Sequence, residues 1–127
     1  MNTRYLAPQI KEDLTRKMVF VGGPRQVGKT TLAKTFLKND EGYLNWDVPL
    51  QREQILKREL PPTNIWVFDE IHKYRGWRNY LKGIYDSKPK NQKIMVTGSA
   101  RLDYYRFSGD SLQGRYYYLR LHPLSLA

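Results

Sequence analysis

The stretch GGPRQVGKTT, residues 22–31, combines glycines, a lysine and hydroxyl side chains in a spacing that suits a triphosphate. Gly23 and Gly28 permit a tight loop whose backbone N–H groups turn inward, and a helix that follows points its positive end at the same place. Lys29 is expected to reach the β- and γ-phosphates, and the Thr30 hydroxyl to ligate Mg²⁺. The predicted phosphate site comprises Gly23, Pro24, Arg25, Gln26, Val27, Gly28, Lys29, Thr30 and Thr31.

A simpler interpretation of the same residues is a glycine-rich turn between a strand and a helix. That interpretation accounts for Gly23 and Gly28 but leaves Lys29 and Thr30 together unexplained. The stretch matches the phosphate-loop pattern GxxxxGK(S/T), known as Walker A, at every fixed position, and a predicted strand and helix flank it. We therefore favour phosphate binding.

Two acids, Asp69 and Glu70, end the apolar run NIWVFDE at residues 64–70, as a Walker B segment does. In P-loop proteins a carboxylate at the end of a buried strand faces Mg²⁺, which makes Asp69 the predicted metal-side residue. Glu70 is expected to lie towards the γ-phosphate and to polarise the attacking water. The simpler alternative is that both acids end the strand in a solvated turn. The span from Lys29 to Asp69 has room for a helix, a strand and a second helix, an arrangement in which the acid pair is a hallmark.

A hydroxyl and an arginine further along the chain complete the candidate catalytic set. Ser99 ends the run KIMVTGS at residues 93–99, and the carboxyl end of such a strand opens onto the same crevice as the phosphate loop. Ser99 is the predicted sensor of the γ-phosphate, with Thr97 as the second choice and a turn or helix cap as the alternative. Arg115 is the predicted arginine finger, and Arg101 lies nearer the sensor. A solvated or carboxylate-paired arginine is the alternative for both.

The periodicity of apolar residues predicts the elements that position these side chains. Strands are predicted at 18–23, 43–46, 64–70, 93–99 and 116–121, and helices at 5–17, 29–37, 49–59 with Asp47 as N-cap, 77–85 and 103–113. Alternating strands and helices indicate an α/β domain with a parallel sheet wrapped by helices.

Composition narrows the class of protein. The chain has 127 residues, a formal net charge of +10 and no cysteine, so we expect one domain without disulfides or thiolate metal sites. No apolar run approaches the roughly 20 residues of a membrane span, and a cytoplasmic location is expected. The positive charge suggests a nucleic-acid surface, whereas the spread of Lys and Arg along the chain favours an ordinary solvated surface.

Four segments in this order, GPRQVGKTT, DEIH, TGS and HPLS, resemble a bacterial and archaeal AAA-type ATPase family. In that family an N-terminal ATPase core precedes a small lid and a C-terminal domain of unknown function, and the resemblance runs from about Tyr5 to Leu126. It implies a three-layer α/β/α P-loop fold with a five-stranded parallel sheet in the order 5-1-4-3-2, and ATP with Mg²⁺ as ligand. The roles it implies are those of phosphate loop, acid pair and sensor for Lys29, Thr30, Asp69, Glu70 and Ser99.

The resemblance also implies an organisation and an activity. Residues 1–127 are expected to be the ATPase core, cut before the lid and the C-terminal domain. The predicted function is Mg²⁺-dependent ATP hydrolysis that drives or switches that C-terminal module, through which a protein or nucleic-acid partner would act; no membrane partner is expected. A nucleotide-dependent binding switch with little hydrolysis and a nucleic-acid-stimulated ATPase are the open alternatives.

Overall fold

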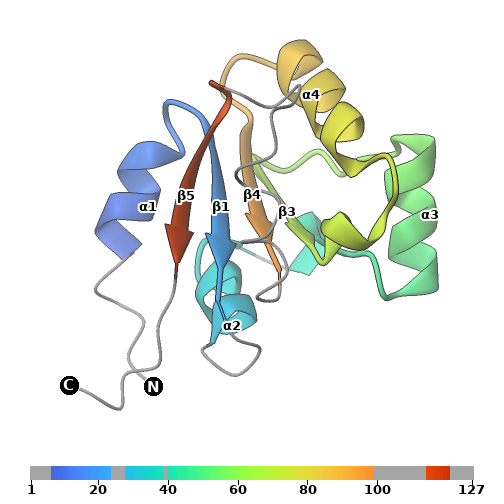
Figure 1. Ribbon diagram of the computed structural model, residues 1–127, viewed down its shortest axis with the longest axis horizontal. Helices are drawn as coiled ribbons and strands as arrows, with labels where there is room; N and C mark the ends of the chain where they lie inside the picture. The colour runs from blue at the N-terminus through green and yellow to red at the C-terminus, as the bar shows by residue number, and fades with distance from the viewer. Residues whose placement is uncertain (1–6, 24–27, 39, 99–113, 121–127) are drawn as a thin grey trace.

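The structure is a computed structural model that describes residues 7–23, 28–38, 40–98 and 114–120. Five parallel strands form one sheet in the order β2-β3-β4-β1-β5 (Figure 1). The strands are β1 (Met18–Gly22), β2 (Tyr43–Asn45), β3 (Ile65–Asp69), β4 (Lys93–Thr97) and β5 (Tyr116–Arg120). The predicted α/β class and the strand order 5-1-4-3-2 are confirmed.

Helices cover both faces of this sheet. Within the described residues, α1 (Ala7–Asp13) and α2 (Lys29–Lys34) pack on one face, and α3 (Pro49–Lys57) and α4 (Trp77–Ser87) pack on the other. The single-turn 3₁₀ helices η2 (Asp40–Gly42) and η3 (Ile71–Lys73) lie in the connections. The predicted three layers are therefore confirmed. No helix in the described part of the chain is long and apolar enough to cross a membrane.

Side chains that alternate along each strand divide the interior into two cores. In β1, Met18 and Phe20 belong to the core under α3 and α4, whereas Val19 and Val21 belong to the core under α1 and α2. All five residues of β1 and all five of β3 are buried. Because helices cover both faces, these strands are apolar along their length rather than alternating.

The ends of two helices differ from the prediction. The N-terminal helix, predicted to end at residue 17, ends at Asp13, because the N–H groups of Thr15 and Arg16 donate to carbonyl oxygens three residues earlier instead of four, at 3.1 and 2.9 Å. The helix predicted to reach Leu37 ends at Lys34. Leu37 still packs against the core under α1 and α2. The apolar pattern therefore predicted its burial correctly but not the end of the helix.

The predicted N-cap of the third helix is wrong. Val48 occupies the cap position before Pro49, and it makes no side-chain capping hydrogen bond. The Asp47 carboxylate instead accepts two hydrogen bonds from Lys73 Nζ, at 2.8 and 3.0 Å. The Asp47 side chain therefore forms an ion pair with a residue distant in sequence instead of capping the helix. The helix predicted at 103–113 lies outside the described residues.

The parallel strands all end at the same edge of the sheet, which we call the carboxyl edge, and all begin at the opposite, amino edge. At the carboxyl edge the register pairs Asp69 of β3 with Asn45 of β2 on one side and with Thr97 of β4 on the other. Thr97 is paired in turn with Val21 of β1. This register brings the segment after β1 and the end of β3 to one place.

Candidate functional site

The helix that follows the loop after β1 begins with a buried lysine. Lys29, the first residue of α2, is 6% exposed, and its Nζ donates to the carbonyl oxygen of Gly23 at 3.0 Å. Gly23 and Gly28 have φ angles of 136° and 86°, which glycine adopts without steric cost. The Lys29 side chain therefore reaches back to Gly23, the first residue of the predicted phosphate loop. Residues 24–27 of that loop lie outside the described ones.

Asp69, at the end of β3, accepts hydrogen bonds from the hydroxyl groups of threonines in α2 and β4. Its Oδ2 accepts a hydrogen bond from Thr30 Oγ1 at 3.2 Å, across 39 residues of sequence. Its Oδ1 accepts one from Thr97 Oγ1 at 2.9 Å. Asp69 is 6% exposed, so these bonds compensate a buried carboxylate. The predicted metal-side residues Thr30 and Asp69 thus lie together, and the Thr97 hydroxyl is bound to the acid.

Tyr43 is a residue of this site that the sequence interpretation missed. Its hydroxyl donates to Asp69 Oδ2 and accepts a hydrogen bond from Asn45 Nδ2 at 3.2 Å. Burial, followed by the hydrogen bond and the charge of Asp69, raises the pKa of Tyr43, so the phenol keeps its proton at neutral pH. The strand order implied by the family resemblance could have indicated Tyr43, because it places the run YLNW beside the strand that carries Asp69.

Glu70 follows Asp69 at the carboxyl edge in a left-handed backbone conformation, with φ of 62°. Its N–H donates to the Thr97 carbonyl oxygen at 2.9 Å, which continues the pairing of β3 with β4 past the last strand residue. Its carboxylate lies 3.5 Å from Lys73 Nζ, the same ammonium group that binds Asp47. The predicted general base is therefore next to the metal-side acid and in contact with a lysine.

Arg115 is not brought to these residues. It immediately precedes β5 at the amino edge, and its Nε and Nη2 lie 3.0 and 3.2 Å from the carboxylate oxygens of Asp86. A five-residue strand is about 16 Å long, so the length of β1 separates Arg115 from the phosphate loop. The pairing with Asp86 matches the alternative given above for this arginine.

The remaining predicted residues are either exposed or not described. Thr31 is exposed on α2, one residue after Thr30. The predicted sensor Ser99 and the arginine near it, Arg101, lie outside the described residues. The described site therefore consists of Lys29, Thr30, Tyr43, Asp69, Glu70 and Thr97.

Comparison with protein families identifies one match. A family model described as an AAA domain matches residues 15–127 of the chain. None of the curated protein sequences matches it.

Solved structures share the fold. A signal transduction ATPase with numerous domains and a tetratricopeptide repeat sensor, from Pyrococcus horikoshii, has a TM-score of 0.56 and 15% identity, over 95% of this chain and 23% of that one. A DNA polymerase III gamma subunit-related protein from Thermotoga maritima has a TM-score of 0.53 and 10% identity, over 92% and 44%. A structure of Pif1 helicases on forked double-stranded DNA has a TM-score of 0.52 and 15% identity, over 96% and 43%. The chain spans less than half the length of each.

Proposed function

Because the chain belongs to the AAA domain family, we propose that it binds Mg²⁺ and ATP at the carboxyl edge of its sheet and hydrolyses the ATP. The observation that carries the proposal is the 3.2 Å hydrogen bond between Thr30 Oγ1 and Asp69 Oδ2, since it joins the phosphate-loop helix to the acid strand. Lys29 precedes Thr30 in α2. A lysine, a hydroxyl and a carboxylate at one edge are the groups that P-loop ATPases use on a triphosphate and its metal.

The donor atoms of the site suit Mg²⁺. Thr30 and Asp69 offer a hydroxyl and a carboxylate oxygen, and Mg²⁺ is usually held by one or two such groups together with phosphates and waters. Among the described residues, no group of three or more His, Cys, Asp or Glu side chains forms another metal site. The bound ion would neutralise charge on the β- and γ-phosphates, and Lys29 would add a second positive charge beside them.

We assign Glu70 the role of general base, which accepts a proton from the attacking water. Its place directly after Asp69 supports this role, and activation requires its carboxylate to leave Lys73 and turn towards the phosphate. We propose Ser99 as the sensor of the γ-phosphate, because it follows β4, whose Thr97 contacts Asp69. A general base in the role assigned to Glu70 typically raises the reaction rate by about 10²- to 10⁴-fold.

Other parts of the proposal concern the surroundings of the phosphates. The backbone of residues 24–27 and the side chain of Thr31 are assigned phosphate contacts. Arg115 has no assigned role at the nucleotide of its own chain, and a role as an arginine finger would need a second copy of the chain. We further propose that turnover drives or switches a C-terminal module and that the protein acts in the cytoplasm.

The substitution Glu70→Gln tests the catalytic assignment. It removes the proton acceptor and leaves the phosphate and metal contacts in place, so ATP binding should persist while turnover falls about 10²- to 10⁴-fold. The measurements are ATP binding at equilibrium and steady-state phosphate release, both with Mg²⁺. Glu59→Gln, at an exposed position just after α3, is the matched control and should behave as the wild type. Unchanged turnover in Glu70→Gln would refute the role of Glu70.

A binding switch with little hydrolysis is the second candidate, and the contact between Glu70 and Lys73 favours it. A carboxylate that contacts an ammonium group must leave it before it can reach the attacking water, so ATP could remain bound without being cleaved. A single-turnover assay separates the two functions, because the switch predicts stable ATP binding and no phosphate release over hours. In that case Lys73→Gln, which removes the ammonium group from Glu70, should raise the rate of release.

A further inference from the structure

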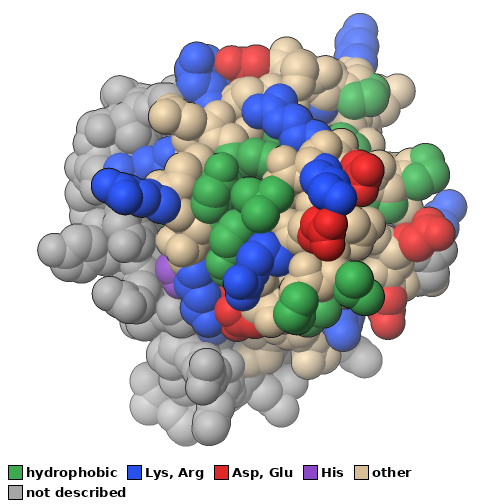
Figure 2. All heavy atoms as spheres, turned by 90° about the vertical axis from the view of Figure 1, so that its right-hand side faces the viewer, with side chains coloured by type: hydrophobic (Ala, Val, Ile, Leu, Met, Phe, Trp, Pro, Cys, Tyr) green, Lys and Arg blue, Asp and Glu red, His purple; other side chains and the backbone are tan. Residues whose placement is uncertain are grey.

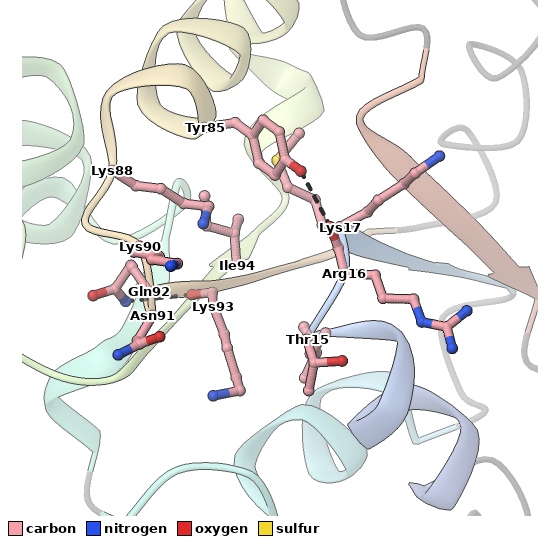
Figure 3. Close-up of a pocket in the computed structure, with 12 residues that line it drawn as sticks. Thr15, Arg16, Lys17, Tyr85, Lys88, Lys90, Asn91, Gln92, Lys93 and Ile94 are labelled. Carbon is pink, nitrogen blue, oxygen red and sulfur yellow. Dashed lines mark hydrogen bonds between the residues drawn. The ribbon is translucent and has the colours of Figure 1, made fainter.

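A pocket of about 180 Å³ opens at the amino edge of the sheet, at the opposite edge from the candidate nucleotide site (Figure 3). Its walls are the segment 14–18 between α1 and β1, the end of α4, and the segment 90–94 that leads into β4. The length of β1, about 16 Å, separates it from the phosphate loop. None of the residues described above as parts of the nucleotide site lines it.

Positive charge dominates this pocket. None of its twelve lining residues is acidic, and five are basic: Arg16, Lys17, Lys88, Lys90 and Lys93. In Figure 3 the ammonium groups of Lys88 and Lys90 extend into the space beside Tyr85, whereas Arg16 and Lys17 point away on the other side. The face around α3 in Figure 2 differs, because acidic side chains lie among its basic ones.

Three of the five basic residues have no compensating acid in the described part of the protein, whereas Arg16 pairs with Glu12 at 3.4 Å. Lys88, Lys90 and Lys93 form no ion pair with any described carboxylate. The nearby Asp86 is bound by Arg115 at 3.0 Å. Burial, followed by the charge of Lys93, lowers the pKa of Lys88, which is the effect expected of a cation without a compensating anion.

The size and lining of the pocket limit the anion that it suits. A volume of about 180 Å³ is below the 300–1,000 Å³ typical of sites for drug-sized ligands, so it fits a single phosphate group better than a whole nucleotide. The side-chain amides of Asn91 and Gln92 add hydrogen-bond donors, whereas the Thr15 hydroxyl already donates to the Glu12 carbonyl oxygen at 2.6 Å. The basic side chains that point away would be unused by a lone phosphate, but they suit neighbouring phosphates of a chain-like anion.

An acidic protein is a weaker fit. The apolar lining residues Leu14, Met18 and Ile94 are 6%, 1% and 1% exposed, so they offer a partner no apolar contact. Protein interfaces usually have an apolar core inside a polar rim. Lysine, in contrast, binds backbone phosphates as a point charge without reading bases.

We propose that this pocket binds a backbone phosphate of a nucleic acid, with the flanking basic residues on adjacent phosphates. The site requires no bound nucleotide, and it goes beyond the proposed ATPase activity. Because the contacts are to phosphate, the binding is independent of base sequence and weakens with salt.

Fluorescence anisotropy of a dye-labelled oligothymidylate, titrated with the full chain at several salt concentrations and without ATP, tests the proposal. The variant Lys88→Gln/Lys90→Gln removes the two ammonium groups that extend into the pocket. The control Lys38→Gln/Lys57→Gln removes the same charge from exposed positions elsewhere. Thermal melting checks that each variant is folded, and Lys90→Gln alone, at an exposed position, replaces the double variant if that one unfolds.

The pocket variant should bind about tenfold more weakly than the wild type, whereas the control should bind nearly as the wild type does. Each lost phosphate contact should reduce the slope of log K against log salt by about 0.7 for a single strand, and therefore by about 1.4 for two. An RNA strand and a DNA duplex of the same length identify the preferred form of nucleic acid.

Four results would overturn the proposal: no binding by the wild type, equal losses in both variants, displacement by polyglutamate, or displacement by inorganic phosphate at matched phosphate concentration. Equal losses in both variants would mean that binding depends on the overall charge rather than on the pocket. Displacement by polyglutamate would indicate an acidic protein partner, and displacement by inorganic phosphate would indicate a site for small anions. ATP binding, measured separately, should be unchanged in Lys88→Gln/Lys90→Gln. This proposal and the ATPase proposal therefore fail independently.

Discussion

At the scale of single residues, the site is organised around one buried carboxylate. Asp69 accepts hydrogen bonds from Thr30, Tyr43 and Thr97, which come from α2, β2 and β4. Hydrogen bonds to an ionised group are stronger than neutral ones, and a buried carboxylate needs them to offset the loss of water. The three hydroxyls therefore fix the orientation of Asp69.

Removing the hydroxyl of Tyr43 should expose this dependence. Tyr43→Phe keeps the ring, over which Lys34 lies at 4.7 Å, and removes one donor to Asp69. We expect the free energy of unfolding to fall by about 1.5–3 kcal/mol without ligand, the range for a hydrogen bond to a charged group. With saturating Mg²⁺ and ATP the loss should be smaller, because the proposed metal would supply the compensating charge. Urea unfolding with and without ligand measures both values.

The matched control for that substitution is Tyr85→Phe, whose hydroxyl donates to the Arg16 carbonyl oxygen at an exposed position. It should cost little and should not respond to ligand. An equal loss for Tyr43→Phe with and without Mg²⁺ and ATP would contradict a link between Tyr43 and the metal site.

The residues of the site were predictable where a motif carries them. Lys29, Thr30 and Asp69 follow from local patterns, and the structure brings them together. The contact of Tyr43 with Asp69 depends on the pairing of β2 with β3. The contact of Glu70 with Lys73 depends on the backbone conformation after β3. Neither contact can be predicted from a local sequence motif.

At the scale of elements, α3 shows which apolar residues hold a helix in place. Within α3, Ile55 is fully buried, whereas Leu50 and Leu56 are 76% and 50% exposed. Figure 2 views the side of the molecule on which α3 lies, and hydrophobic side chains are visible there among charged ones. Only the buried side chain contributes to the core under α3 and α4.

A pair of alanine substitutions in α3 should separate these two kinds of apolar residue. Ile55→Ala should lower the free energy of unfolding by about 2–5 kcal/mol, because it leaves a cavity. Leu50→Ala, the control, should change it by about 0.5 kcal/mol or less, because that side chain is largely in water. Urea denaturation of both variants measures the difference. Similar losses would contradict the packing of α3 on the sheet.

Strands were easier to predict than helix ends. The apolar runs at 18–23 and 64–70 contain β1 and β3 with one or two extra residues, because burial on both faces leaves an uninterrupted apolar segment. Helix ends depend on hydrogen bonds and tertiary contacts that the periodicity does not contain. The end of α1 and the pairing of Asp47 with Lys73 are two such cases.

At the scale of the whole molecule, the sheet separates two charged sites. The carboxyl edge holds the candidate nucleotide site, and the amino edge holds the lysine-lined pocket. β1 and β4 run from one edge to the other, so the two sites share the same strands. The strand order that creates this arrangement came from the family resemblance rather than from periodicity, which predicts strands but not their neighbours.

Phosphate release from ATP in a single turnover is the most direct test of the central claim, that the carboxyl edge hydrolyses ATP. The wild-type chain, in excess over radiolabelled ATP, should release phosphate only when Mg²⁺ is present. Lys29→Ala should weaken ATP binding and abolish release, because it removes the buried ammonium group that is expected to bind the phosphates. ATP that binds tightly and stays intact in the wild type, or equal release by Lys29→Ala, would contradict the account.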